Sequence, residues 1–224
     1  IGACTILAIS VQYSVDRAHR AGIPKGVLNL VVGKESRDIG DELTSNPKVK
    51  KITFTGSTPV GKHLLKQSAN TVKKVSMELG GNAPVIIFDD ADIAAAVEDV
   101  VASKFRNAGQ TCICINRILV QDGIYEQFVA QLTARVNDLI VGHGLCSNTS
   151  IGPMINVGAK NSMQELVDDA IAKGAEITTG GKSATIGPCF YLPTVLSQVT
   201  DDMRVMREEI FGPIAPVRRF STVS

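Results

Sequence analysis

The sequence predicts an α/β fold built on a mainly parallel sheet. Short apolar runs alternate along the chain with longer segments whose apolar residues recur at helical spacing. Such alternation is typical of strand, helix, strand units, in which the helix returns the chain so that the two strands run parallel. Hydrophobic residues make up 44% of the 224, enough to bury a substantial core.

The first part of the chain is expected to alternate helix, strand, helix and strand, at residues 11–21, 27–32, 37–43 and 51–55. Gly22 ends the first helix, because glycine readily adopts the left-handed conformation that closes a helix. Asn46-Pro47 ends the second, because a proline disfavours helical backbone at the residue before it.

The remaining elements are predicted from the same two periodicities. They are a helix at 59–69, strands at 72–78 and 84–88, a helix at 92–105, a strand at 118–120, helices at 125–140 and 157–173, and a strand at 214–220. Pro59 suits the first turn of its helix, where no backbone N–H is needed. The pattern begins and stops without closing elements, so we expect an interior fragment of a longer subunit.

Charge and hydropathy exclude two classes of partner. The net charge of +1 comes from 23 basic and 22 acidic residues spread along the chain, which predicts no nucleic acid partner. No apolar run is long enough to cross a bilayer, so no membrane partner is expected. The small basic clusters Lys73-Lys74 and Arg218-Arg219 are interpreted as solvated faces.

The cysteine and histidine positions argue against disulfides and metals. Five scattered cysteines form a poor disulfide framework and favour a reducing compartment; they are Cys4, Cys112, Cys114, Cys146 and Cys189. The three histidines stand alone, without partners at ligand spacing, so no metal site is predicted.

The stretch FTGSTPVGK joins a strand to a helix and carries a candidate anion site. Gly56 lets the backbone approach closely and Ser57 can cap the helix. The N–H groups at the helix start would attract a phosphate. The same residues also suit an ordinary capped turn, so both interpretations stay open.

The stretch MELGGNAP places Glu78 at the end of an apolar strand, before two glycines. A half-buried carboxylate there would be less acidic than in water and could act as a general base. The alternative is a strand-end glutamate that faces solvent.

The stretch FRNAGQTCICINR delivers Cys112 on a loop of small and polar residues, which favours an accessible nucleophilic thiolate. Cys114 lies between isoleucines and is expected to be buried and inert. If the segment is extended the two thiols share one face, and if it is helical they diverge. A cysteine protease would need a histidine base, and no histidine lies in a segment that looks catalytic.

The stretch REEIFGPIAP, read alone, is a loop with one buried phenylalanine. In that interpretation Glu208 and Glu209 are solvated.

The order of these four stretches resembles the NAD(P)-dependent aldehyde dehydrogenase superfamily, over about Ala21 to Phe220. SKFRNAGQTCICINR is most similar to its succinate-semialdehyde dehydrogenase branch. The resemblance implies the C-terminal part of a Rossmann-type cofactor domain over residues 1–78. It implies an α/β catalytic domain, incomplete at its C-terminus, over residues 79–224.

The resemblance also implies roles for the matching residues. Cys112 would attack the aldehyde carbon, giving a thiohemiacetal and then a thioester, and Glu78 would activate the water that hydrolyses it. Arg106 would bind a distal carboxylate of the substrate, and Cys114 would pair with Cys112 under oxidation. Cofactor contacts would come from Gly56 and Ser57 at the pyrophosphate, Glu209 at the nicotinamide ribose, and Phe211 and Gly80 at the nicotinamide.

The implied activity is oxidation of succinate semialdehyde with NAD or NADP, which the sequence does not distinguish. Full-length subunits would form homo-oligomers, in the cytoplasm or in the mitochondrial matrix of a eukaryote. A coenzyme-A-acylating dehydrogenase is an alternative that retention of Glu78 disfavours. A truncated, inactive chain or non-enzymatic partner is another, because the family's first half, with the Asn of its oxyanion hole, is missing.

Overall fold

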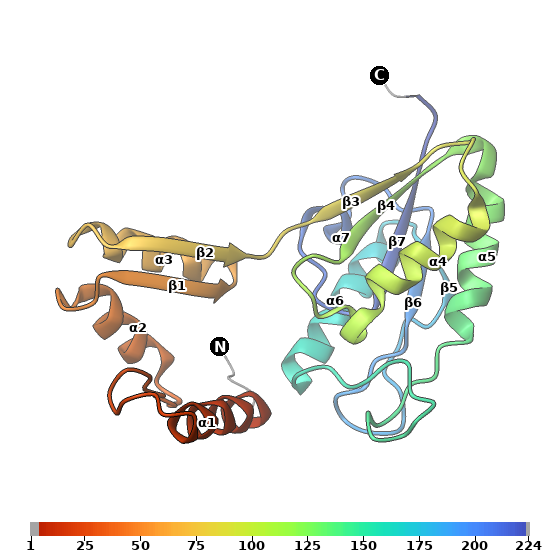
Figure 1. Cartoon of the computed structure of the whole chain (residues 1–224). Helices are drawn as coiled ribbons and strands as arrows, with labels where there is room; N and C mark the ends of the chain where they lie inside the picture. Colours follow the sequence, from red (N-terminus) through yellow and green to blue (C-terminus); the bar gives the residue numbers. More distant parts are fainter. Residues whose placement is uncertain (1–4, 223–224) are drawn as a thin grey trace. The chain divides into compact units, whose positions relative to one another are not determined.

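The computed structural model describes residues 5–222, which form two compact units divided between Gly80 and Gly81 (Figure 1). We call the part up to Gly80 unit 1 and the part from Gly81 unit 2, and each is described by itself.

Unit 1 is built on a single strand, helix, strand repeat. Its elements are α1 (Thr5–Arg20), α2 (Ser36–Ser45), β1 (Lys51–Gly56), α3 (Thr58–Ala69) and β2 (Lys74–Leu79). The two strands pair in parallel, from Lys51 opposite Lys74 to Gly56 opposite Leu79, and α3 connects them. Ile52 of β1 and Leu64 of α3 are buried between helix and sheet. This arrangement brings the carboxyl ends of both strands to one edge.

The strand predicted at 27–32 is wrong. The segment is a turn followed by irregular backbone, and its apolar side chains remain exposed, Val31 by 73%. A strand needs a hydrogen-bonded neighbour, and in the described part of unit 1 β1 pairs with β2 alone. The apolar run therefore borders a groove instead of joining a sheet.

Lys73 corrects the interpretation of Lys73-Lys74 as a solvated face. Its side chain is buried, and its Nζ donates hydrogen bonds to the carbonyls of Asn46 and Val49 at 2.6 and 2.9 Å. A lysine can satisfy a loop in this way because its ammonium carries three donors.

Unit 2 is a five-stranded sheet with helices on both faces. Its helices are α4 (Ile93–Lys104), α5 (Tyr125–Asn137), α6 (Val157–Ala172) and α7 (Arg204–Arg207), with the 3₁₀ turns η1 (Arg106–Gly109) and η2 (Asp122–Ile124). Its strands are β3 (Ala83–Ile87), β4 (Ile115–Gln121), β5 (Glu176–Thr179), β6 (Thr194–Ser197) and β7 (Ile214–Phe220).

The strand order is β3-β4-β7-β6-β5, and every pair is parallel except the antiparallel β5 with β6. The predicted α/β class with a mainly parallel sheet is confirmed. Neighbouring residues of β6 enter different cores: Val195 packs with α4 and α5, and Leu196 with α6 and α7. Alternation along a strand thus supplies a core to each face of the sheet.

Unit 2 also contains elements that the sequence did not predict. The strands β5 and β6 have four residues each, and all four of β6 are buried, so no alternation marks it. Arg218 and Arg219 are not simply solvated either. Arg218 pairs with Asp201 at 2.6 Å, and the guanidinium of Arg219 lies 4.1 Å from the centre of the Tyr125 ring. Among the described residues, no helix is long and apolar enough to cross a membrane.

Candidate active site

The loop that carries Cys112 begins with an unusual backbone. α4 ends at Lys104, and in η1 Asn107, Ala108 and Gly109 have positive φ angles of 52°, 55° and 72°. Left-handed backbone is costly for residues other than glycine. Such strain persists where the surrounding structure determines the conformation, and it gathers at functional sites.

Two contacts hold this loop in place. Gly109 packs so closely on the carbonyl of Gly212 that a Cβ would overlap its oxygen. The side chain of Gln110 accepts a hydrogen bond from the N–H of Ile155 at 2.8 Å and donates one to the carbonyl of Pro153 at 3.2 Å. The backbone that leads to Cys112 is therefore held in place by two separate contacts.

The two cysteines of Cys-x-Cys lie in different surroundings. A turn closed by the N–H of Cys114 and the carbonyl of Thr111, at 3.2 Å, contains Cys112 and Ile113. Cys112 is exposed, whereas Cys114 is 3% exposed and its thiol lies 3.4 Å from the carbonyl of Gly109. Both are free thiols. The segment is neither extended nor helical, and within the turn one thiol is exposed and the other is buried.

Arg106 stands at the start of the same loop. It is exposed, and its guanidinium forms no hydrogen bond or ion pair with the residues that the structure describes. An exposed, unpaired guanidinium in the loop that carries Cys112 is available to bind an anionic group of a ligand.

The acidic pair after α7 divides into two roles. Glu208 is exposed and forms a bidentate pair with Arg204 at 2.7 and 3.0 Å, which lowers the pKa of Glu208. Glu209 is half-buried, and its Oε1 accepts a hydrogen bond from the N–H of Gly81 at 3.3 Å. The interpretation of Glu209 as solvated is therefore wrong, because its backbone partner lies far away in the sequence.

Phe211 is 43% exposed. The expectation of a buried phenylalanine in this stretch is wrong, since Ile210 is the residue that enters the core. The ring of Phe211 is left free to contact a ligand.

In unit 1, Ser57 occupies the N-cap position of α3 in extended backbone, and its side chain makes no capping hydrogen bond. Pro59 lies in the first turn. A Cβ at Gly56 would meet the Phe54 ring, so only glycine fits before the helix without a shift. The hydroxyl and the first N–H groups of α3 thus remain available to an anion.

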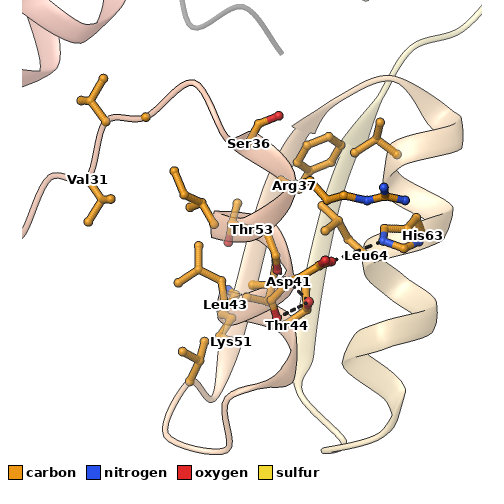
Figure 2. Close-up of a pocket in the computed structure, with 18 of the residues that line it drawn as sticks. Val31, Ser36, Arg37, Asp41, Leu43, Thr44, Lys51, Thr53, His63 and Leu64 are labelled. Carbon is orange, nitrogen blue, oxygen red and sulfur yellow. Dashed lines mark hydrogen bonds and ion pairs between the residues drawn. The ribbon is translucent and has the colours of Figure 1, made fainter.

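Next to this helix start, unit 1 contains a cavity of about 800 Å³. Figure 2 shows it between the segment at Val31, α2, β1 and α3. Asp41 of α2 and His63 of α3 both line it and lie next to each other (Figure 2), with 3.6 Å between Oδ1 and Nε2. A hydrogen bond from Gln67, then the interaction with His63, lowers the pKa of Asp41. Sequence reasoning missed the cavity because it placed 27–32 in the sheet.

Glu78 lies near the end of β2, opposite Thr55 of β1, and is exposed. Of the two interpretations of Glu78, a half-buried carboxylate and a strand-end glutamate that faces solvent, the exposure within unit 1 agrees with the second. Glu78 and Gly80 belong to unit 1, whereas Cys112, Arg106, Glu209 and Phe211 belong to unit 2.

Sequence reasoning also missed Lys104 and Asn116. Lys104 is fully buried at the end of α4, and its Nζ donates to the Asn116 side chain at 3.1 Å. A lysine in the last turn of a helix ordinarily faces solvent, so the sequence held no signal for this contact.

Comparison with known proteins places these features in a family context. The profile described as "Aldehyde dehydrogenase family" matches residues 6–224. The chain is 54% identical to "Succinate-semialdehyde dehydrogenase, mitochondrial" of Oryza sativa subsp. japonica, covering 98% of the chain and 43% of that protein. It is 55% identical to "3-sulfolactaldehyde dehydrogenase" of Pseudomonas putida, covering 96% and 44%.

A further relative is "Succinate-semialdehyde dehydrogenase [NADP(+)] GabD" of Escherichia coli (strain K12), which is 51% identical over 92% of the chain and 42% of that protein. Among solved structures, succinate-semialdehyde dehydrogenase from Burkholderia pseudomallei superposes with a TM-score of 0.91 at 52% identity, covering 93% of the chain and 43% of that structure. The chain therefore spans less than half the length of these relatives.

Proposed function

This chain belongs to the aldehyde dehydrogenase family, and from that premise we propose that it carries the nucleophile of an enzyme that oxidises an aldehyde with NAD or NADP. One observation carries the proposal: Cys112 is an exposed thiol in a turn that follows a strained, tightly held loop. An accessible thiol at a fixed position is what covalent catalysis requires. Family membership, implied by the order of the sequence motifs, is confirmed.

The proposed chemistry begins at Cys112. Its thiolate adds to the aldehyde carbon, and the oxygen takes up a proton to give a thiohemiacetal. NAD(P), when bound, would supply the nicotinamide that accepts a hydride from this carbon, and loss of the hydride together with the hydroxyl proton, released to solvent, would leave a thioester on Cys112. Glu78 takes a proton from a water molecule as that water adds to the thioester. The bond to sulfur breaks, and the acid leaves with Cys112 restored.

The residues proposed to bind the cofactor lie at the start of α3, at the end of β2 and in the segment after α7. Gly56 and Ser57 precede α3, whose uncapped first turn suits a pyrophosphate. The adjacent apolar cavity is wide enough for a planar base. Glu209 would hold the nicotinamide ribose, and Phe211 and Gly80 would flank the nicotinamide.

The proposed substrate is a short aldehyde with an anionic group at its far end, with succinate semialdehyde as the first choice. Arg106 supports this, because an exposed and unpaired guanidinium can bind a carboxylate through two parallel hydrogen bonds. The names of the relatives agree on the class but not on the compound, since one oxidises a semialdehyde and another 3-sulfolactaldehyde. A guanidinium suits a sulfonate as well as a carboxylate.

We further propose that Cys112 and Cys114 pair under oxidation. Cys114 would have to leave its contact with the carbonyl of Gly109, so the pairing requires rearrangement of the turn. A crosslinked Cys112–Cys114 peptide after peroxide treatment would support this pairing. Absence of the crosslinked peptide would contradict the pairing.

For the compartment and the assembly we propose cytoplasm or mitochondrial matrix, and a homo-oligomer. The rice relative carries "mitochondrial" in its name.

Two alternatives stay with the proposal. A coenzyme-A-acylating enzyme would pass the acyl group to a thiol instead of water, and the presence of Glu78 disfavours it. An inactive chain or non-enzymatic partner is the other alternative, and the absence of turnover in a folded chain would support it.

The test is formation of NAD(P)H by the purified chain with succinate semialdehyde and each cofactor, under reducing conditions. Cys112→Ser should abolish it, whereas Cys146→Ser, which alters another exposed cysteine, should not. Arg106→Leu should raise KM for the semialdehyde about tenfold or more, with little change for an uncharged aldehyde. Arg135→Leu, which alters an arginine paired with Glu98, is the matched control. A folded chain without turnover would contradict the proposal.

A further inference from the structure

A ring of hydrogen bonds in unit 2 links the buried Lys104 to the half-buried Glu209. Lys104 donates from Nζ to Asn116 Oδ1 at 3.1 Å, and Asn116 donates from Nδ2 to the carbonyl of Gly81 at 2.9 Å. The N–H of Gly81 donates to Glu209 Oε1 at 3.3 Å. The ring closes because Lys104 also donates to the carbonyl of Ile210 at 3.4 Å, the residue after Glu209.

Each side of this ring comes from a different part of the chain. Lys104 is the last residue of α4, Asn116 lies in β4, Gly81 is the first residue of unit 2, and Glu209 and Ile210 follow α7. Two further contacts attach the first residues of unit 2 to the same elements. Asn82 donates to the carbonyl of Met206 at 3.0 Å and accepts from Arg117 at 3.0 Å through its own carbonyl.

Lys104 is the ring's only cation, and it is fully buried. Burial lowers the pKa of Lys104 to about 8, while the charges of Cys114 and Glu209 oppose that shift. These are the ionisable groups that act on it, and its hydrogen-bond partners, Asn116 and the carbonyl of Ile210, are neutral. A buried ammonium that is easily deprotonated contributes little to the stability of the fold. We therefore look for the role of Lys104 in the groups that it positions.

We propose that Lys104 is a positioning residue that holds Glu209 and the backbone at Gly81 in register with each other. It acts on Glu209 along two routes, through the Ile210 carbonyl and through Asn116 and Gly81. The consequence for a bound cofactor rests on the function proposed above, in which Glu209 holds the nicotinamide ribose. The ring itself does not depend on that function.

Two backbone amides report on the two routes separately. The N–H of Phe211 shares a peptide group with the Ile210 carbonyl, and the N–H of Asn82 shares one with the Gly81 carbonyl. Loss of the Lys104 charge changes the polarisation of both peptide groups. In NMR spectra of the isotope-labelled chain, we expect both amide signals to shift together with a midpoint at about pH 8.

Lys104→Met should abolish both titrations, because methionine keeps the length of the side chain without its charge. Asn116→Leu cuts only one route, so Phe211 should still titrate and Asn82 should not. Lys73→Met is the matched control, since Lys73 is also buried and donates to two carbonyls, but in unit 1. Lys73→Met should leave the pH titration of both amide signals unchanged.

The proposed role of Lys104 is contradicted if neither amide titrates near about pH 8 in the unaltered chain, or if both still titrate in Lys104→Met. The unaltered chain gives an answer even where a variant fails to fold. In a second measurement, Lys104→Met should raise the dissociation constant for NADP by about fivefold to tenfold, as expected for networked groups, and Lys73→Met should not. Equal affinity in Lys104→Met and the unaltered chain would overturn the link to Glu209. Absence of NADP binding by the unaltered chain would instead contradict the proposed function, with the amide titrations still testing the ring.

Discussion

At Gly109 a single residue meets two constraints, a φ of 72° and the close carbonyl of Gly212. Gly109→Ala should therefore destabilise the chain by about 3 kcal/mol or more, since left-handed strain and a backbone clash add. Gly174→Ala is the matched control, because Gly174 has a φ of 98° but open space around it. It should cost only about 1 kcal/mol. Urea unfolding of both variants gives the comparison, and equal losses would show that the packing on Gly212 does not constrain the loop.

The thiols differ in access, and this can be measured without turnover. In the native chain, iodoacetamide should label Cys112 and Cys146 before Cys114, which is buried against Gly109. Mass spectrometry of peptides after increasing labelling times gives the order. Early labelling of Cys114 would mean that the turn opens readily and would favour pairing of the two cysteines.

Lys104 makes the stability of unit 2 depend on pH in a direction opposite to that of a salt-bridged lysine. Its pKa is about 8 in the folded chain, against 10.5 for a lysine free in water, so between these values the unfolded chain binds more protons. Stability should therefore rise with pH across this window, by about 3 kcal/mol in all. Urea unfolding at about pH 7 and about pH 10 should show this rise in the unaltered chain relative to Lys104→Met. The same pH response in both would contradict the assignment.

Short sequence motifs single out candidate site residues, such as Cys112, Arg106 and Glu209, but they do not predict what surrounds them. Glu209 was interpreted as solvated and Lys104 was not considered. In each case the partner that matters, Gly81 for Glu209 and Asn116 for Lys104, becomes a neighbour only through the sheet. When a side chain is buried by residues far away in the sequence, the local pattern of apolar residues does not predict its burial.

Among the helices, α4 and α3 differ in how their first turns are capped, and this difference can be tested by mutation. Asp92 caps α4 by accepting from the N–H of Ala95 at 3.1 Å, whereas Ser57 makes no such bond in α3. Asp92→Ala should cost about 1 kcal/mol of unfolding free energy. Ser57→Ala should cost clearly less, yet weaken cofactor binding. Thermal unfolding and a binding titration of both variants decide this, and an equal loss of stability would show that Ser57 is a structural cap.

Helices with one buried face were predictable from the sequence, as in α4 and α6. The strand β7 was predictable as an apolar run, although its first four residues are all buried and do not alternate. The failures have physical causes. The run at 27–32 has strand-forming residues but no pairing partner in the described chain, and β6 is too short and too buried to alternate.

At the scale of the whole molecule, the two units should differ in local stability. Unit 1 has a two-stranded sheet, and such sheets are marginal unless packed against further structure. Unit 2 places the fully buried Ile118 of β4 and Val217 of β7 on its central strands. Hydrogen exchange should therefore be faster in peptides from β1 and β2 than in those from β4 and β7. The reverse order would mean that the core of unit 2 is not the stable part of the chain.

In the proposed mechanism, Cys112 forms a thioester that Glu78 helps to hydrolyse. The most direct measurement is intact-protein mass spectrometry of Glu78→Gln after incubation with succinate semialdehyde and NAD or NADP, followed by peptide mapping. A succinyl group added to Cys112 should accumulate in Glu78→Gln, turn over in the unaltered chain and be absent from Cys112→Ser. A folded Glu78→Gln chain that binds cofactor but carries no acyl group on Cys112 would contradict it.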